Sequence, residues 1–277
     1  PGMADYVHTV DADEQAKIAS FLRWFAIGSL LFIAAIIVLF VTADRWLRLI
    51  SIESERRFIE PYINLLVESD IVESDPVLQT YVGDLARDMH VQLGGEPELE
   101  LRVFVVEGEM INAFATLGGY IFVFDSLIEA VEDENSLAMV LGHEIAHVHH
   151  RDPLLGTGRA MLIQLALSTF SGNGLDPNTV NVGSDVILNQ YSREQELAAD
   201  ELALQLVHER YEHVGGTTRL FEIIRSDLED VQFAEFLSTH PATDARIERI
   251  EALTAEYGWP VGEPTPYPDA VLEALRD

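Results

Sequence analysis

The longest apolar run of the chain is residues 24–43 (WFAIGSLLFIAAIIVLFVTA), which carries no charge over 20 residues. A helix of this length matches the roughly 30 Å hydrocarbon core of a bilayer. A cleavable signal peptide is one alternative, since residues 41–43 resemble a cleavage site, and a core helix is another. The acidic leader and the length of the run argue against a signal peptide, and the lack of a polar stripe argues against a core helix. We predict a retained transmembrane anchor at residues 21–43.

Basic residues flank this anchor on both sides. Two precede the run and four follow it: Lys17, Arg23, Arg45, Arg48, Arg56 and Arg57. The positive-inside rule places the more basic flank in the cytosol. The number of basic residues on each flank therefore favours a cytosolic C-terminal domain, but it does not fix the side of the membrane. We expect a single-pass protein of a bacterial inner membrane.

Beyond the anchor, the spacing of apolar residues predicts mostly helices. The predicted helices are residues 53–68, 76–93, 136–149, 154–170, 184–211, 218–227 and 241–257, and the predicted strands are 99–106 and 120–124. Glycines and an arginine interrupt residues 154–170, which we interpret as a buried or membrane-grazing helix, and residues 171–183 have the composition of a loop. The pattern predicts a helix-dominated α+β domain with a small sheet.

These elements divide the 277-residue chain into five segments. We expect an acidic tail at 1–20, the anchor at 21–43, a juxtamembrane linker at 44–57, one folded domain at 58–257 and a C-terminal tail at 258–277. A single large domain is what this length supports once an anchor is set aside.

Charge and cysteine content narrow the function classes. Asp and Glu number 47 against 17 Lys and Arg, a formal charge of −30, which repels nucleic acid and argues against a nucleic-acid partner. The chain has no cysteine, so a disulfide framework, a thiolate nucleophile and a thiolate metal site are excluded. Any metal must therefore be held by histidine and carboxylate.

Residues 143–147 read HEIAH inside one predicted helix. The spacing of four places His143 and His147 on one helix face, where two imidazoles can hold one metal ion. An exposed helix with incidental histidines is the alternative, but the apolar residues 137–141 favour burial, and buried histidines and a glutamate without partners would be costly. A bound metal, Zn²⁺ above all, removes that cost.

A hydrolytic zinc site needs a third protein ligand and leaves one position for water. Glu196 and Asp200 lie four residues apart in a predicted helix and share a face. We expect Glu196 to bind the metal and Asp200 to brace a zinc-bound histidine from behind. Glu194 and Glu201 point elsewhere on this helix, where a solvated charged face is expected.

Three motifs, in this order, resemble one family of proteases. They are HEIAHVHHRD from His143, SREQELAAD from Ser192, and His240-Pro241 with Arg246. They resemble the gluzincin-type zinc metallopeptidases that include HtpX, the CAAX prenyl proteases and the Oma- and BepA-like proteases. The resemblance covers residues 58–257 and implies a zincin-like fold.

The resemblance also implies roles for individual residues. Glu144 would be the general base, zinc would lie on the three ligands named above, and His240 and Arg246 would lie at the active site. We expect these two to donate hydrogen bonds to the developing oxyanion, with Tyr191 as a weaker candidate. Four further histidines are expected to be surface or packing residues: His149, His150, His208 and His213. The alternative is that one of them is the fourth zinc ligand in a latent state.

Residues 112–115 (NAFA), followed by Gly118-Gly119, resemble the segment that leads into the family's cleft strand, although Thr116-Leu117 replaces the commoner Leu-Pro. We expect residues 120–124 to expose a sheet edge that receives an extended peptide by strand addition. The expected substrate-binding residues are Asn112, Ala113, Phe114, Gly119 and Tyr120.

The sequence thus predicts a membrane-anchored zinc endopeptidase acting on unfolded or extended segments of membrane or envelope proteins, with a homo-oligomer as an open option. A catalytically silent zinc protein that acts as a chaperone-like assembly factor is the alternative, but Glu144 is present although zinc binding does not require it. A prenyl-peptide processing enzyme fits less well with a single span.

We predict that the anchor stays uncleaved in the membrane. Alkaline carbonate extraction should leave the protein in the membrane pellet, and mass spectrometry should find residues 21–43 in the mature chain. A mature N-terminus at Asp44 would show that the run is a signal peptide.

Overall fold

The structure is a computed structural model that describes residues 11–68, 75–94, 99–171, 190–226, 233–241 and 244–276. Its contacts divide the chain into two units, Pro1–Trp46 and Leu47–Asp277. Of the loop expected at residues 171–183, all but the first residue lies outside the described residues.

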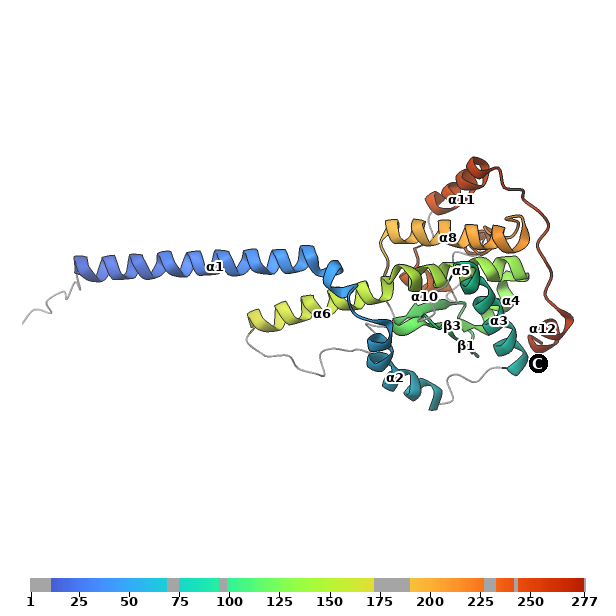
Figure 1. Cartoon of the computed structure of the whole chain (residues 1–277), viewed down its shortest axis with the longest axis horizontal. Coiled ribbons are helices and arrows are strands. Elements are labelled where there is room, and N and C mark those ends of the chain that lie inside the picture. The colour runs from blue at the N-terminus through green and yellow to red at the C-terminus, as the bar shows by residue number, and fades with distance from the viewer. Residues whose placement is uncertain are drawn as a thin grey trace, which may run out of the picture. The chain divides into compact units, whose positions relative to one another are not determined.

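The first unit holds the helix α1 (Ala12–Leu47) except for its last residue (Figure 1). Asp13 and Glu14 lie in its first turn, where negative charge is favourable beside the helix dipole. Within the described residues, this is the helix long and apolar enough to cross a membrane. The anchor expected from the sequence is therefore part of one continuous helix.

The second unit contains a three-stranded sheet formed by β1 (Arg102–Val106), β2 (Ala113–Thr116) and β3 (Tyr120–Phe124). The strand order is β1-β3-β2, with β1 parallel and β2 antiparallel to β3. The expectation that residues 120–124 form an exposed edge is wrong, because β3 is paired on both sides. The edge near the predicted site is β2, which sequence periodicity did not identify as a strand.

Helices surround this sheet. They are α2 (Ile52–Glu68), α3 (Pro76–Gln92), α4 (Asp125–Val131), α5 (Glu134–His150), α6 (Asp152–Ser171), α8 (Arg193–Tyr211), α9 (Arg219–Ser226), α10 (Ala234–Thr239), α11 (Asp244–Tyr257) and α12 (Asp269–Ala274). The predicted helix-dominated α+β class is confirmed. From one side to the other, the layers are α11, α8, α5, the sheet and α2 (Figure 1).

The two faces of the sheet pack against different helices because side chains alternate along a strand. Ile121 and Val123 of β3 belong to the main core with α3 and α5, whereas Tyr120 and Phe122 belong to a second cluster that includes Ile59 of α2. The sheet is thus buried between α5 and α2.

Several boundaries differ from the sequence predictions. Helix α8 begins at Arg193, because Ser192 and Gln195 form a capping box. The short helices α4, α10 and α12 were not predicted. Residues 258–277, expected as a tail, contribute buried Tyr267 and Val271 to the core.

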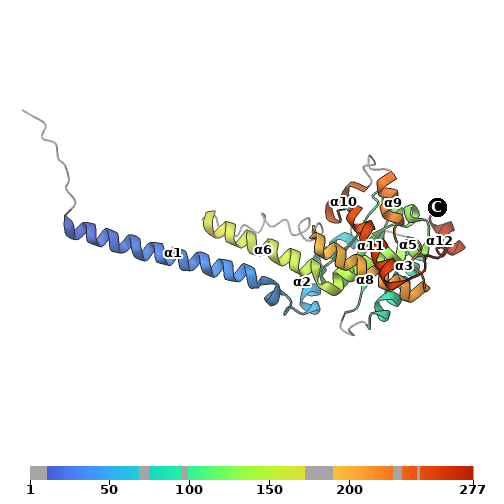
Figure 2. The same ribbon diagram turned by 90° about the horizontal axis from the view of Figure 1, so that it is seen from above.

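Helix α6, expected to be buried or membrane-grazing, changes character along its length. Leu154 and Leu155 near its start are buried, whereas Ile163 and Leu165 are 49% and 44% exposed. Its second half projects beyond the sheet and the other helices of this unit (Figure 2). Exposed apolar side chains on a projecting helix are compatible with contact to a membrane surface.

Helix α2 holds the turn that joins β2 to β3, the 3-10 segment Leu117–Gly119. The buried Glu55 carboxylate accepts from Gly118 N–H at 2.9 Å, and Arg56 Nε donates to Gly118 C=O at 2.9 Å. Glu55 also pairs with Arg151, the residue that ends α5. One juxtamembrane helix therefore fixes both the turn and the end of the HEIAH helix.

We predict that Gly118→Ala destabilises the protein by more than Gly94→Ala. Both glycines have positive φ, +74° and +66°, but an added Cβ at Gly118 would lie 2.7 Å from Arg56 Cγ, whereas nothing lies within 4 Å at Gly94. The left-handed backbone costs about 1–2 kcal/mol in both variants, and overpacking adds about 1–3 kcal/mol at Gly118. Denaturant unfolding in detergent measures both, and equal losses would contradict the proposed contact.

Candidate metal centre and active site

Helices α5 and α8 lie side by side and carry most of the candidate residues. Gly142 permits this close approach, because a Cβ there would lie 3.1 Å from the Cα of Ala203 on α8. Asp133 caps the start of α5 by accepting from Ser136 N–H at 2.8 Å. The packing of the two helices brings the HEIAH motif of α5 against Glu196 and Asp200 of α8.

Four side chains that could bind one metal ion converge in the interior. One ligand atom from each of His143, His147, Glu196 and His240 lies within 4.8 Å of the other three, and all four residues are buried. His143 Nε2 lies 3.0 Å from His147 Nε2 and 3.2 Å from His240 Nδ1. Glu196 Oε1 lies 3.1 Å from His240 Nδ1 and 3.5 Å from His147 Nε2. The three ligands predicted from sequence are brought together, and His240 joins them.

The outer nitrogens of the two motif histidines are committed to carboxylates. His143 Nδ1–H donates to Asp200 Oδ1 at 2.9 Å, and His147 Nδ1–H donates to Asp152 Oδ2 at 2.9 Å. A neutral imidazole that donates through Nδ1 presents a lone pair at Nε2. With both imidazoles neutral, the two Nε2 lone pairs would face each other and the Glu196 carboxylate, an arrangement that repels itself unless a metal ion or a proton lies between them.

The buried charges point to the same conclusion. Among the described residues, this network contains one buried guanidinium, that of Arg246. It contains four buried carboxylates, those of Glu144, Asp152, Glu196 and Asp200. Burial alone would lower the pKa of His147, but its hydrogen bonds to Asp152 and Glu196 raise that pKa to about 9. The site thus attracts positive charge, and two imidazoles with a carboxylate are the donor set that suits a divalent metal such as zinc.

Arg246 holds the carboxylates of α8 in place. Its Nε and Nη2 donate to the two oxygens of Asp200 at 2.7 Å each, and its Nη1 lies 2.5 Å from Glu196 Oε2. Its guanidinium also lies over the Phe221 ring, 4.7 Å from the centroid. Burial would raise the pKa of Asp200, but the hydrogen bonds from Arg246 lower it overall, so Asp200 is held as a charged acceptor for His143.

Glu144 lies beside the four-residue cluster. It is fully buried, and neither carboxylate oxygen makes a hydrogen bond of normal geometry among the described residues. Burial raises the pKa of Glu144, while His240, whose Nε2 lies 3.5 Å from Oε1, and the backbone of Ala115 oppose that shift. Its free oxygens and raised pKa are properties of a carboxylate that can accept and return a proton.

Asp152 is a site residue that the sequence analysis did not assign. Its Oδ2 accepts from His147, while Oδ1 accepts from Gln195 Nε2 at 2.7 Å. Gln195 is also the capping-box residue of α8. Asp152 was visible as the last letter of HEIAHVHHRD, but only the tertiary structure shows that it faces back to His147.

The remaining candidates lie in different places. Tyr191 stacks on the His147 ring with centroids 3.9 Å apart. His208 stacks on Trp259, and His213 accepts from Gly215 N–H. These two, like His149 and His150, are outside the four-residue cluster found among the described residues.

Sequence comparisons agree with this geometry. The sequence profile described as Peptidase family M48 matches residues 74–254. The chain is 30% identical over 169 residues to the mitochondrial metalloendopeptidase OMA1 of Schizosaccharomyces pombe, covering 58% of this chain and 49% of that protein. It is 28% identical over 190 residues to a protease HtpX homolog of Sulfurovum sp., covering 54% of this chain and 68% of that protein.

The beta-barrel assembly-enhancing protease of Escherichia coli is 24% identical over 211 residues, which cover 72% of this chain and 43% of that protein. The chain therefore spans about half or less of the length of two of these relatives. Because the family profile matches more than half of the chain, including all four converging residues, the expected membership is confirmed: this chain belongs to peptidase family M48, a family of metallopeptidases.

Proposed function

We propose that this chain is a membrane-anchored, zinc-dependent endopeptidase that hydrolyses peptide bonds in extended or unfolded segments of membrane and envelope proteins. The main support for this proposal is that His143, His147 and Glu196 converge beside the buried Glu144. These three residues would hold zinc, which would polarise the scissile carbonyl and lower the pKa of a bound water. The names of the relatives, all proteases, support the reaction class.

Glu144 is the proposed general base. Its unpartnered oxygens can accept a proton from the attacking water and later deliver it to the leaving amine. Its burial excludes bulk water, which would otherwise compete for that proton. His240 Nε2, which faces Glu144 and lacks a hydrogen-bond partner among the described residues, is the proposed donor to the oxyanion.

Arg246 receives a different role from the one expected from sequence. Its donors face Asp200 and Glu196, so we assign it to positioning these carboxylates rather than to contacting the oxyanion. Removing it would leave two buried carboxylates without their cation, which costs several kcal/mol in stability.

The free edge of β2 is the proposed site for the substrate backbone. Phe124 N–H donates to Asn112 C=O at 3.0 Å, and the hydrogen-bonded pairs of an antiparallel ladder recur every second residue. The backbone groups of Ala113 and Ala115 therefore point away from β3. Among the described residues, β2 has a strand partner only on its β3 side, so an extended peptide can pair with Ala113.

Asn112 supports this placement. Its side chain is 2% exposed, and its Oδ1 has no hydrogen-bond partner among the described residues, so it can accept from a substrate N–H. Gly119 and Tyr120 lie elsewhere, at the turn held by α2 and in the cluster packed on Ile59. We therefore keep Asn112, Ala113 and Phe114 as the proposed substrate-binding residues.

One observation favours the alternative of a silent or latent zinc protein. His240 Nδ1 is one of the four converging ligand atoms, and a metal with four protein ligands has no position for water. The two candidates differ in a direct way, because a silent protein cleaves nothing whereas a peptidase cleaves and depends on Glu144.

We predict that Glu144→Gln binds zinc like the wild type but loses nearly all turnover, because an amide neither accepts nor returns the proton. Zinc content by atomic absorption and cleavage of unfolded casein measure the two properties. Glu194→Gln, on the exposed face of α8, is the matched control and should keep both. Undiminished cleavage by Glu144→Gln would exclude Glu144 as the base.

We also predict that Asp152→Asn weakens zinc binding by about 10- to 100-fold. In the wild type, the Asp152 carboxylate orients the His147 ring and makes it more basic, and the substitution removes this carboxylate. Competition with a fluorescent chelator measures the dissociation constant without any need for activity. Asp84→Asn, a change at an exposed ion pair with Arg87, is the control. An unchanged zinc affinity for Asp152→Asn would show that Asp152 does not position the ligand.

A further inference from the structure

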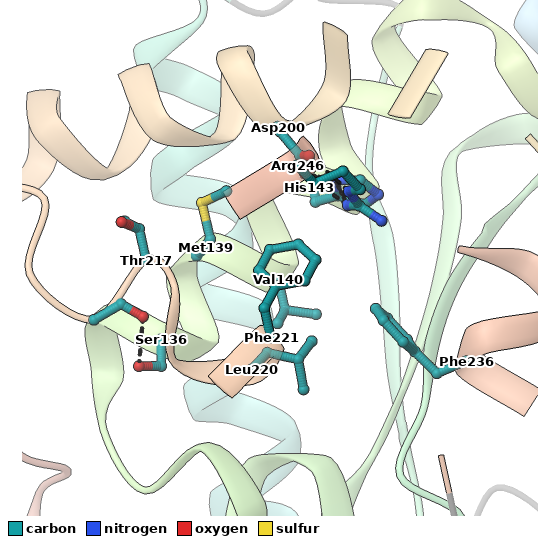
Figure 3. Close-up of a pocket in the computed structure, with 11 residues that line it drawn as sticks. Ser136, Met139, Val140, His143, Asp200, Thr217, Leu220, Phe221, Phe236 and Arg246 are labelled. Carbon is teal, nitrogen blue, oxygen red and sulfur yellow. Dashed lines mark hydrogen bonds and ion pairs between the residues drawn. The ribbon is translucent and has the colours of Figure 1, made fainter. Parts of the chain in front are cut away.

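Helix α6 presents apolar side chains away from the metal centre. The apolar pocket beside His143 adjoins that centre and is part of the site described above (Figure 3). The second half of α6, residues 159–171, instead projects from the domain (Figure 2), and Ile163 and Leu165 are exposed there. Because these side chains do not face the metal centre, their exposure points to a partner outside the domain.

The composition of α6 differs from that of the rest of the chain. The chain has 47 Asp and Glu in 277 residues, yet residues 153–171 contain neither, and Arg159 is the one charged residue in this segment. Gln164 and Ser168 lie one turn apart on one side of the helix, and Ile163 and Leu165 flank the opposite side. The second half of α6 therefore has a narrow polar side and a broad apolar side, which is typical of a helix at a membrane surface.

The start of this half of α6 is held against the end of the anchor helix. A Cβ added at Gly158 would lie 2.5 Å from Leu47 Cδ2, so the Leu47 side chain covers Gly158. Leu47 is the first residue of the second unit and the last residue of α1. It follows the uncharged run, which ends at Ala43, by about 6 Å along the helix. Gly158 therefore lies close to the level at which the chain leaves the bilayer.

Two hydrogen bonds keep the residues after the anchor beside the start of α6. Arg48 Nη1 donates to His150 C=O at 2.9 Å, and Arg151 Nη2 donates to Ile50 C=O at 2.6 Å. Between them, Leu49 is 75% exposed. The connection from the anchor to α6 is thus short and fixed at both sides, so α6 stays close to the bilayer.

The second half of α6 is too short to cross the membrane. Residues 159–171 extend about 20 Å along the helix, whereas a hydrocarbon core is roughly 30 Å thick. Arg159, at the start of this half, is exposed. An arginine at the membrane surface keeps its guanidinium among the lipid phosphates while its carbon chain lies along apolar groups. These features suit a helix that lies in the interfacial layer of the bilayer.

We propose that residues 159–171 bind the surface of the phospholipid bilayer that holds α1, with Ile163 and Leu165 among the acyl chains and Arg159 at the phosphates. This is a second membrane contact, made by the domain itself. Since α6 begins at Asp152, which orients His147, the contact holds the metal centre close to the membrane. The proposal depends on the anchor in α1 and not on the proposed peptidase function.

The absence of cysteine makes a direct test possible, because one introduced cysteine takes one fluorophore. Full-length Ile163→Cys, labelled with an environment-sensitive fluorophore, is reconstituted into liposomes of phosphatidylcholine and phosphatidylglycerol that contain spin-labelled lipids. The fluorophore should lie about 5–10 Å below the headgroups, so a spin label high on the acyl chain should quench it more than one at the chain end. No quenching by either lipid would overturn the proposal, and so would stronger quenching from the chain end.

Two labelled positions serve as controls. Val261→Cys should not be quenched, because Val261 is 74% exposed in the segment that joins α11 to α12, at the opposite end of the second unit from α6 (Figure 1). Ile33→Cys, in the middle of the uncharged run, should be quenched most by the chain-end label. An unquenched Ile33 would overturn the anchor and this proposal together, whereas a quenched Ile33 with an unquenched Ile163 would overturn this proposal alone.

A second test places one negative charge on either side of the helix, with the fluorophore kept at position 163. Leu165→Asp should lower quenching by at least about half, because a carboxylate on the apolar side opposes insertion. Gln164→Asp carries the same charge on the polar side and should leave quenching unchanged. Melting curves in detergent show whether both variants are folded. Equal quenching in the two folded variants would contradict a lipid contact through the apolar side of α6.

Discussion

The rest of this domain depends on a buried electrostatic repulsion that added positive charge, from a metal ion or a proton, relieves. Lone pairs of His143 and His147 and the carboxylate of Glu196 converge in a buried space, together with His240. Arg246 neutralises part of the surrounding negative charge through Asp200 and Glu196. Buried charges without partners cost several kcal/mol, so positive charge placed among these groups stabilises this region.

The scaffold satisfies this constraint by fixing two helices against each other. Gly142 lets α5 approach α8 at Ala203, and the capping-box residue Gln195 of α8 also donates to Asp152 at the start of α6. Each metal-facing histidine is thereby oriented by a carboxylate from a different element. A small shift of α8 would move Glu196 and Asp200 together and would disturb the hydrogen bond from Gln195 to Asp152, which ties helix packing directly to the geometry of this cluster.

Around this centre, the proposed recognition of substrate depends on the edge of β2. This edge offers main-chain hydrogen bonds, which do not distinguish one sequence from another. The juxtamembrane helix α2 holds the turn at Gly118 and, through Arg151, the end of α5, so the residues after the anchor are structurally linked to both the strand and the HEIAH helix.

The sequence alone determined the features that depend on local spacing. The apolar run of α1, the helical face shared by His143 and His147, and the face shared by Glu196 and Asp200 all follow from the period of one helix. The tertiary structure decided what depends on residues far apart in the chain. That β2 rather than β3 is the edge, that His240 reaches the cluster, that Arg246 pairs with Asp200, and that Asp152 turns back to His147 are all consequences of packing between elements. Periodicity carries no information about such pairings, because many partners satisfy the same local pattern and only the assembled core selects one.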